Sequence, residues 1–105
     1  MTRFYLEITV RASGLPADKV ERLFDPLADA VYDLVDVIDA DLGARIGDSE
    51  FDFTMAVDAE DEPSALTVGL SAVRCALHAV GGSTPGWEDH FAAIQSLVRQ
   101  EPAAA

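Results

Sequence analysis

The chain has 105 residues, half of them apolar, and a formal net charge of −12 at pH 7. This length and apolar content are typical of one globular domain; we expect it to cover residues 1–100, with a flexible tail at 101–105. Nucleic acids and anionic membranes are bound through Lys and Arg, so this excess of carboxylates argues against both partners.

The first two predicted elements are a strand and a helix. Residues 3–12 alternate strictly between polar and apolar side chains, which indicates a strand with one buried face. Residues 17–34 instead place apolar side chains at helical spacing. Pro26 interrupts this segment, either by kinking one helix or by opening a second helix capped by Asp25. The apolar stripe keeps its phase across the proline, so we predict one kinked helix.

Two more alternating runs, residues 36–46 and 51–58, flank the polar turn sequence GDSE and predict an antiparallel hairpin. Its pairing is expected to set Arg45 opposite Asp52, and Asp39 opposite Asp58. Opposed carboxylates are unfavourable, and a bound cation would relieve them. Two solvated carboxylates beside an arginine of the first strand are the simpler interpretation.

A second helix is predicted from about residue 65 to 80, where two glycines end it. Residues 91–99 alternate as an edge strand does, although apolar side chains from Trp87 onward also fit a helix. A fourth strand would complete a ferredoxin-like βαββαβ arrangement. We therefore predict an α+β fold with a four-stranded antiparallel sheet and two helices on one face.

The second predicted helix carries only one charge, Arg74. A helix that is apolar or small on most sides is usually covered, which predicts an interface on its outer side; harmless exposure of small residues is the alternative. Trp87 either anchors that interface or covers the end of the core. The residues assigned to the interface are Val68, Ala72, Cys75, Ala79 and Trp87.

The rarest side chains, among them both histidines, lie between Arg74 and Phe91. Cys75 and His78 are three residues apart, but structural zinc takes four ligands in paired short spacings. A nucleophilic cysteine would need an orienting partner that the sequence does not identify. We therefore predict no metal, no cofactor and no catalytic residue. The apolar runs are only a few residues long, so we expect no segment to span a bilayer. Together with a lone cysteine and an N-terminus that lacks the pattern of a signal peptide, this predicts a cytoplasmic protein.

Residues 51–82, FDFTMAVDAEDEPSALTVGLSAVRCALHAVGG, resemble a segment of small actinobacterial proteins. There, an acidic residue and a DF strand precede the pattern E.S...A..SAI.DV....G. In some of these proteins a ferredoxin-like N-terminal region is followed by a helix-turn-helix, whereas this chain is more similar to those without one. The resemblance implies the ferredoxin-like fold. It carries over neither DNA binding nor a catalytic residue.

The leading functional prediction is a small, acidic, non-enzymatic protein–protein interaction module. It would self-associate or dock on a protein partner, and a basic partner would suit its charge. The alternative is a dimeric ferredoxin-like protein that binds a small ligand between sheet and helices, or a cofactor-free oxygenase of that shape. Tyr5, Trp87 and His90 would then line the pocket.

Overall fold

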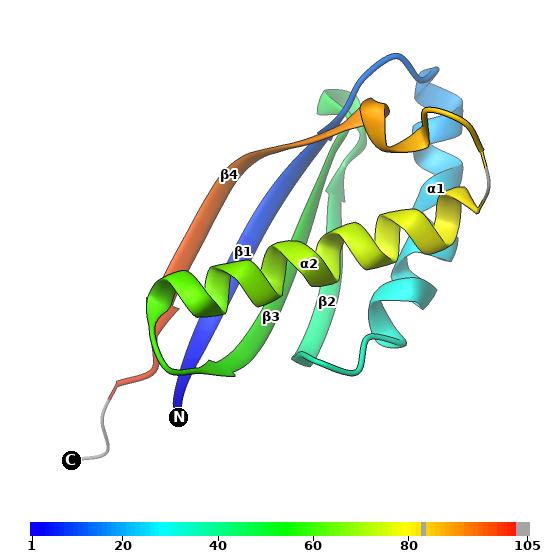
Figure 1. The fold of residues 1–105 in the computed structure, drawn as a ribbon. Helices are drawn as coiled ribbons and strands as arrows, with labels where there is room; N and C mark the ends of the chain where they lie inside the picture. Colours follow the sequence, from blue (N-terminus) through cyan, green and yellow to red (C-terminus); the bar gives the residue numbers. More distant parts are fainter. Residues whose placement is uncertain (83, 103–105) are drawn as a thin grey trace.

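The computed structural model describes residues 1–82 and 84–102. The element order confirms the predicted ferredoxin-like βαββαβ fold, and the last element is a strand, not a helix (Figure 1). Residues 103–105 of the predicted tail lie outside the described residues. The elements are β1 (Thr2–Ala12), α1 (Ala17–Tyr32), β2 (Ile38–Arg45), η1 (Ile46–Asp48), β3 (Glu50–Ala59), α2 (Glu62–Gly81), η2 (Trp87–His90) and β4 (Phe91–Gln100).

The four strands form one antiparallel sheet in the order β2-β3-β1-β4, so β1 and β3 lie at its centre. Their alternating apolar side chains point to the face that the helices cover, and the other face is open (Figure 1). The largest fully buried side chains come from β1, α1 and β3: Ile8, Val10, Val20, Leu27, Val31, Phe51, Phe53 and Val57.

The hairpin between β2 and β3 differs from the predicted register by two residues. Arg45 lies opposite Glu50, and Gly43 lies opposite Asp52. The reason is that η1 and Ser49, which has a left-handed φ of 54°, form the turn, so β3 starts one residue earlier than expected.

Asp39 and Asp58 are not opposed either. The β2–β3 pairing shifts between Ile38 and Asp41, and Asp39 itself has a left-handed φ of 51°. Asp58 instead lies opposite Arg3 and accepts its guanidinium hydrogen bonds at 2.9 and 3.1 Å. The described residues contain no group of three or more His, Cys, Asp or Glu placed to hold a metal ion.

Helix α1 is one continuous helix with Pro26 inside it, as predicted. Helix α2 begins three residues before the predicted start, because Asp61 caps it by accepting a hydrogen bond from the Ser64 amide at 2.8 Å. Hydrogen bonding by Ser64, through its side chain first and its amide second, holds the pKa of Asp61 below its usual value. A carboxylate is favourable at this end of a helix because the unpaired amides there carry partial positive charge.

The buried face of α2 consists mainly of small residues, joined by Val73 and Leu77. Gly69 lies so close to β1 that a β-carbon there would sit 2.5 Å from the Leu6 side chain. Ala65 and Ala72 are buried, whereas Leu70 is only partly buried. The small residues let the helix approach the sheet closely, and the larger ones lie to its sides.

By length and composition, α2 is apolar enough to cross a membrane, which corrects the expectation that no segment is. In this fold its small and apolar residues pack on the sheet, as the residues of a core helix do.

Trp87 covers the end of the core beyond α2. Its indole N–H donates a hydrogen bond to the Leu77 carbonyl at 2.8 Å, and the side chain is buried. The ring packs directly against Gly81, where any β-carbon would overlap it. Of the two roles considered for Trp87, the structure shows the one in which it covers the core.

This packing makes Gly81 the most size-sensitive position at the end of α2. We expect Gly81→Ala to lower the free energy of unfolding by about 1–3 kcal/mol, because the added methyl group must displace the Trp87 ring. Gly47→Ala is the matched control, since a β-carbon there meets nothing within 4 Å. Urea denaturation measures both variants, and equal stabilities would contradict this account of Trp87.

Candidate functional site

The first candidate site is a hollow between α2 and β4 on the helix side of the sheet, here called the α2–β4 pocket. Its volume is about 290 Å³. Six of its eight lining side chains are apolar, and the two charged ones come from α2 and η2. The lining residues are Val10, Leu70, Val73, Arg74, Leu77, Glu88, Phe91 and Ala93.

The pocket exists because α2 lies close to β1 but leaves the start of β4 uncovered. The pairing of β1 with β4 shifts between Thr9 and Val10, so that Gln95 faces Thr9 and Ala93 faces Val10. Ile94 falls in this bulge without a partner. Ala93 therefore lies on the helix side of the sheet, where its short side chain stays exposed and leaves the space open.

The segment η2 forms the outer wall of the pocket. Trp87 holds it in place from the core side, with the Phe91 ring packed edge-on at 5.1 Å between centroids. Glu88 lies beside His78 of α2, with Oε1 and Nδ1 3.1 Å apart. The apolar floor of the pocket thus has one cation, Arg74, and one partnered carboxylate around it.

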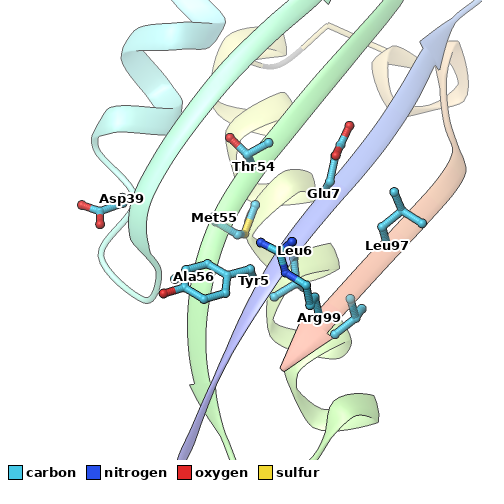
Figure 2. Close-up of a pocket in the computed structure, with 10 residues that line it drawn as sticks. Tyr5, Leu6, Glu7, Asp39, Thr54, Met55, Ala56, Leu97 and Arg99 are labelled. Carbon is cyan, nitrogen blue, oxygen red and sulfur yellow. The ribbon is translucent and has the colours of Figure 1, made fainter. Parts of the chain in front are cut away.

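The second candidate site is a shallow groove on the open face of the sheet, here called the open-face groove (Figure 2). Its volume is about 510 Å³. Figure 2 shows the lining side chains, which extend from neighbouring strands. Asp39 lies apart from the others, at the sheet edge that β2 forms. The lining residues are Tyr5, Leu6, Glu7, Asp39, Thr54, Met55, Ala56, Leu97, Val98 and Arg99.

Two side chains of the open-face groove, Tyr5 and Arg99, already have partners. The Tyr5 hydroxyl donates to a Glu101 carboxylate oxygen at 3.1 Å, and this hydrogen bond raises the pKa of Tyr5. The Arg99 guanidinium lies over the Tyr5 ring, 5.8 Å from its centroid (Figure 2). Because the groove is open sheet surface and its Tyr5 and Arg99 side chains are already engaged, we take the α2–β4 pocket as the better candidate for a ligand site.

The rest of the open face carries a charge network. Glu50 is nearly buried and accepts hydrogen bonds from Arg45 at 2.8 Å and from Arg11 at 2.6 Å. These two guanidinium groups, Arg45 first, hold the pKa of Glu50 below its usual value. Arg45 also pairs with Asp52, which accepts from the Thr9 hydroxyl at 2.7 Å. The network neutralises charge within the sheet and stabilises the fold.

Of the three side chains predicted to line a common pocket, Trp87 and His90 lie edge to face with ring centroids 6.3 Å apart, but Tyr5 does not join them. Tyr5 lies on the open face, whereas Trp87 is buried on the helix side. His90 Nδ1 lies 2.8 Å from the Ser13 carbonyl oxygen and ties η2 to the loop after β1. Trp87 and His90 thus position the segment that carries Glu88 to the pocket.

The predicted interface residues of α2 are divided between the core and the surface. Ala72 is buried against the core, and Val68 is partly buried, so their lack of charge is explained by the chain's own packing. Cys75 and Ala79 are exposed. All four line two hollows, of about 580 and 520 Å³, between α2 and the end of α1 with the segment that follows it.

The sequence interpretation missed Phe91 and Ala93 as pocket residues and named Arg74 only as a lone charge. The alternation of Ala92, Ile94, Ser96 and Val98 suggested one face, but the bulge at Ile94 moves Ala92 to the opposite one. The only sequence feature that pointed to an open space beside β4 was the pair of alanines at the start of that strand.

No family model and no curated protein matches the chain. One solved structure does, that of a Chloroflexus aurantiacus J-10-fl protein provisionally named an antibiotic biosynthesis monooxygenase. The two chains are 13% identical, the match covers 99% of this chain and 97% of the other, and the TM-score is 0.53. At this identity the likeness shows that the two proteins share a fold.

This comparison corrects the leading functional prediction. The prediction of a non-enzymatic interaction module is wrong, because the fold match over nearly the whole chain is to a protein named for a reaction on a small molecule. The charge-poor helix that suggested the module turns its small residues to the sheet instead. The comparison favours the alternative, a small-ligand-binding or oxygenase-like protein.

The charge network gives a pH-dependent prediction. The folded-state pKa of Glu50 is depressed, so its stabilisation is present above pH about 4.5 and is lost as the pH falls through the folded value. We expect Glu50→Gln to lower the melting temperature by several degrees at pH 7 and by progressively less below pH about 4.5.

Glu60→Gln is the control for Glu50→Gln, since it removes the same charge from an exposed site. It should leave the melting temperature unchanged or raise it slightly, because the chain is strongly acidic. Thermal denaturation followed by circular dichroism from pH 3 to 8 measures both variants. A Glu50→Gln deficit that is constant across this range would rule out the ionised network as its source.

Proposed function

We propose that this protein binds a small apolar molecule in the α2–β4 pocket and acts on it as an oxygenase-like enzyme. The observation that carries the proposal is the pocket itself, a concave space between helix and sheet with apolar walls and two charged side chains. Binding sites for small molecules typically combine a mainly apolar lining with a few polar groups that orient the ligand.

The dimensions of the pocket limit its ligand. A volume of about 290 Å³ is at the lower end of the range for ligand pockets, so it suits one compact ring system and not a large cofactor. Leu70 and Leu77 lie on one wall, and Phe91 lies on another. Burial of an apolar ring against these side chains would supply the main part of the affinity.

The oxygenase-like part of the proposal is supported by the fold shared with the C. aurantiacus protein. Monooxygenation places one atom of O₂ in the substrate and reduces the other to water, so electrons come from the substrate or from an added reductant. A test of activity therefore needs two conditions, one with substrate alone and one with a flavin and a nicotinamide reductant also present.

The site is tested by filling the pocket. Ala93→Leu adds three carbon atoms beside Val10 on the helix side, whereas Ala92→Leu adds the same atoms on the open face, beside Arg11. Both alanines are exposed, so both variants should keep the wild-type melting temperature. We expect Ala93→Leu to weaken the binding of compact aromatic ligands about tenfold or more, and Ala92→Leu to leave it unchanged.

Binding is measured by calorimetry and by the fluorescence of Trp87, the only tryptophan. Equal affinities for the two leucine variants would place the ligand elsewhere and overturn the proposed site. For a ligand that binds, an oxygen electrode then measures O₂ consumption. Turnover by the wild type that is lost in Ala93→Leu is the expected result; binding without O₂ consumption in either condition would overturn the oxygenase-like part.

A further inference from the structure

We infer that the ligand of the α2–β4 pocket is a small apolar monoanion, most simply a carboxylate, and that Arg74 binds its charged group. The inference rests on the proposed function, because it describes the ligand of the same pocket. It is carried by an arginine that lines an apolar pocket and, among the residues that the structure describes, has neither a carboxylate nor an aromatic partner.

The other arginines are already occupied. The chain has 19 acidic residues against seven basic ones. Four arginines bind carboxylates, and Arg99 lies over the Tyr5 ring. In residues 1–82 and 84–102, Arg74 has no carboxylate oxygen within 4.0 Å. The four occupied pairs are Arg3–Asp58, Arg11–Glu50, Arg22–Asp18, and Arg45 with both Glu50 and Asp52.

The position of Arg74 suits a ligand with an apolar body. Leu70 precedes it by four residues and Leu77 follows it by three, so all three lie along one side of α2 and line the pocket together. An arginine stem packs along such an apolar surface and leaves the guanidinium at the rim, in water. The planar guanidinium can then donate two parallel hydrogen bonds to a carboxylate, which a lysine ammonium cannot.

The other charged residue of the pocket restricts the ligand further. Glu88 on η2 is exposed and lies beside His78. Its carboxylate repels a second negative group on the ligand, so a monoanion whose charge lies at the Arg74 side fits better than a dianion. A cationic ligand would instead be attracted by Glu88 and repelled by Arg74. It is therefore the contrasting probe for an experiment.

Three probes with one ring system and different charges separate these cases: 1-naphthoate, 1-naphthalenemethanol and 1-naphthylmethylammonium. Each is titrated into wild type by calorimetry at low and high salt. We expect the carboxylate to bind about tenfold or more tightly than the alcohol, to lose part of that advantage at high salt, and to bind more tightly than the ammonium at both.

Substitutions at Arg74 provide the matched comparison. Arg74→Gln should abolish the preference for the carboxylate over the alcohol without changing the affinity for the alcohol. Arg74→Lys should keep part of the preference, because the charge remains while the paired hydrogen bonds are lost. Arg22→Gln removes the same charge from α1, where Arg22 is exposed and pairs with Asp18, and should change nothing.

The outcomes distinguish the inference from the proposed function. Equal affinities of carboxylate and alcohol, or a preference unchanged in Arg74→Gln, would overturn the inference. If the alcohol still binds and Ala93→Leu still excludes it, the proposed site survives that result. If none of the three probes binds the wild type, both the inference and the proposed pocket are overturned.

Discussion

The α2–β4 pocket depends on how Trp87 packs against the end of α2. Gly81 lacks a side chain, so the Trp87 ring can lie against the helix and donate its N–H to the Leu77 carbonyl. That contact fixes η2, and η2 in turn sets where Phe91 begins β4. With a bulkier residue in place of Gly81, the ring could not occupy this position. The outer wall of the α2–β4 pocket is therefore a consequence of core packing.

Helix α2 uses its two kinds of residue for two purposes. Its small residues, such as Gly69 and Ala72, bring the backbone close to the sheet and close the core. Its longer side chains are displaced toward β4, where the alanines and the bulge leave room. The arginines are also divided between two roles. Most of them form ion pairs on the open face of the sheet or on α1. Arg74 remains available beside an apolar space.

The fold could be predicted from sequence because strict alternation and helical spacing report which side of each element is buried. The alternation also placed Tyr5 opposite the core side of β1, which already separated it from a pocket under the helices. The hairpin register could not be predicted, since it depends on the left-handed conformation of Ser49. The pocket could not be predicted either. It results from a bulge at Ile94 and from the distance between two elements, and neither leaves a periodic signal.

The central claim is that the ligand lies between α2 and β4 and not on the open face. Nuclear Overhauser effects between bound 1-naphthoate and the protein's methyl groups test this most directly, because the two sites present different methyl groups. The account predicts contacts from the naphthalene protons to Val73, Leu77 and Ala93. Contacts to Thr54 and Leu97 would place the ligand in the open-face groove and contradict it.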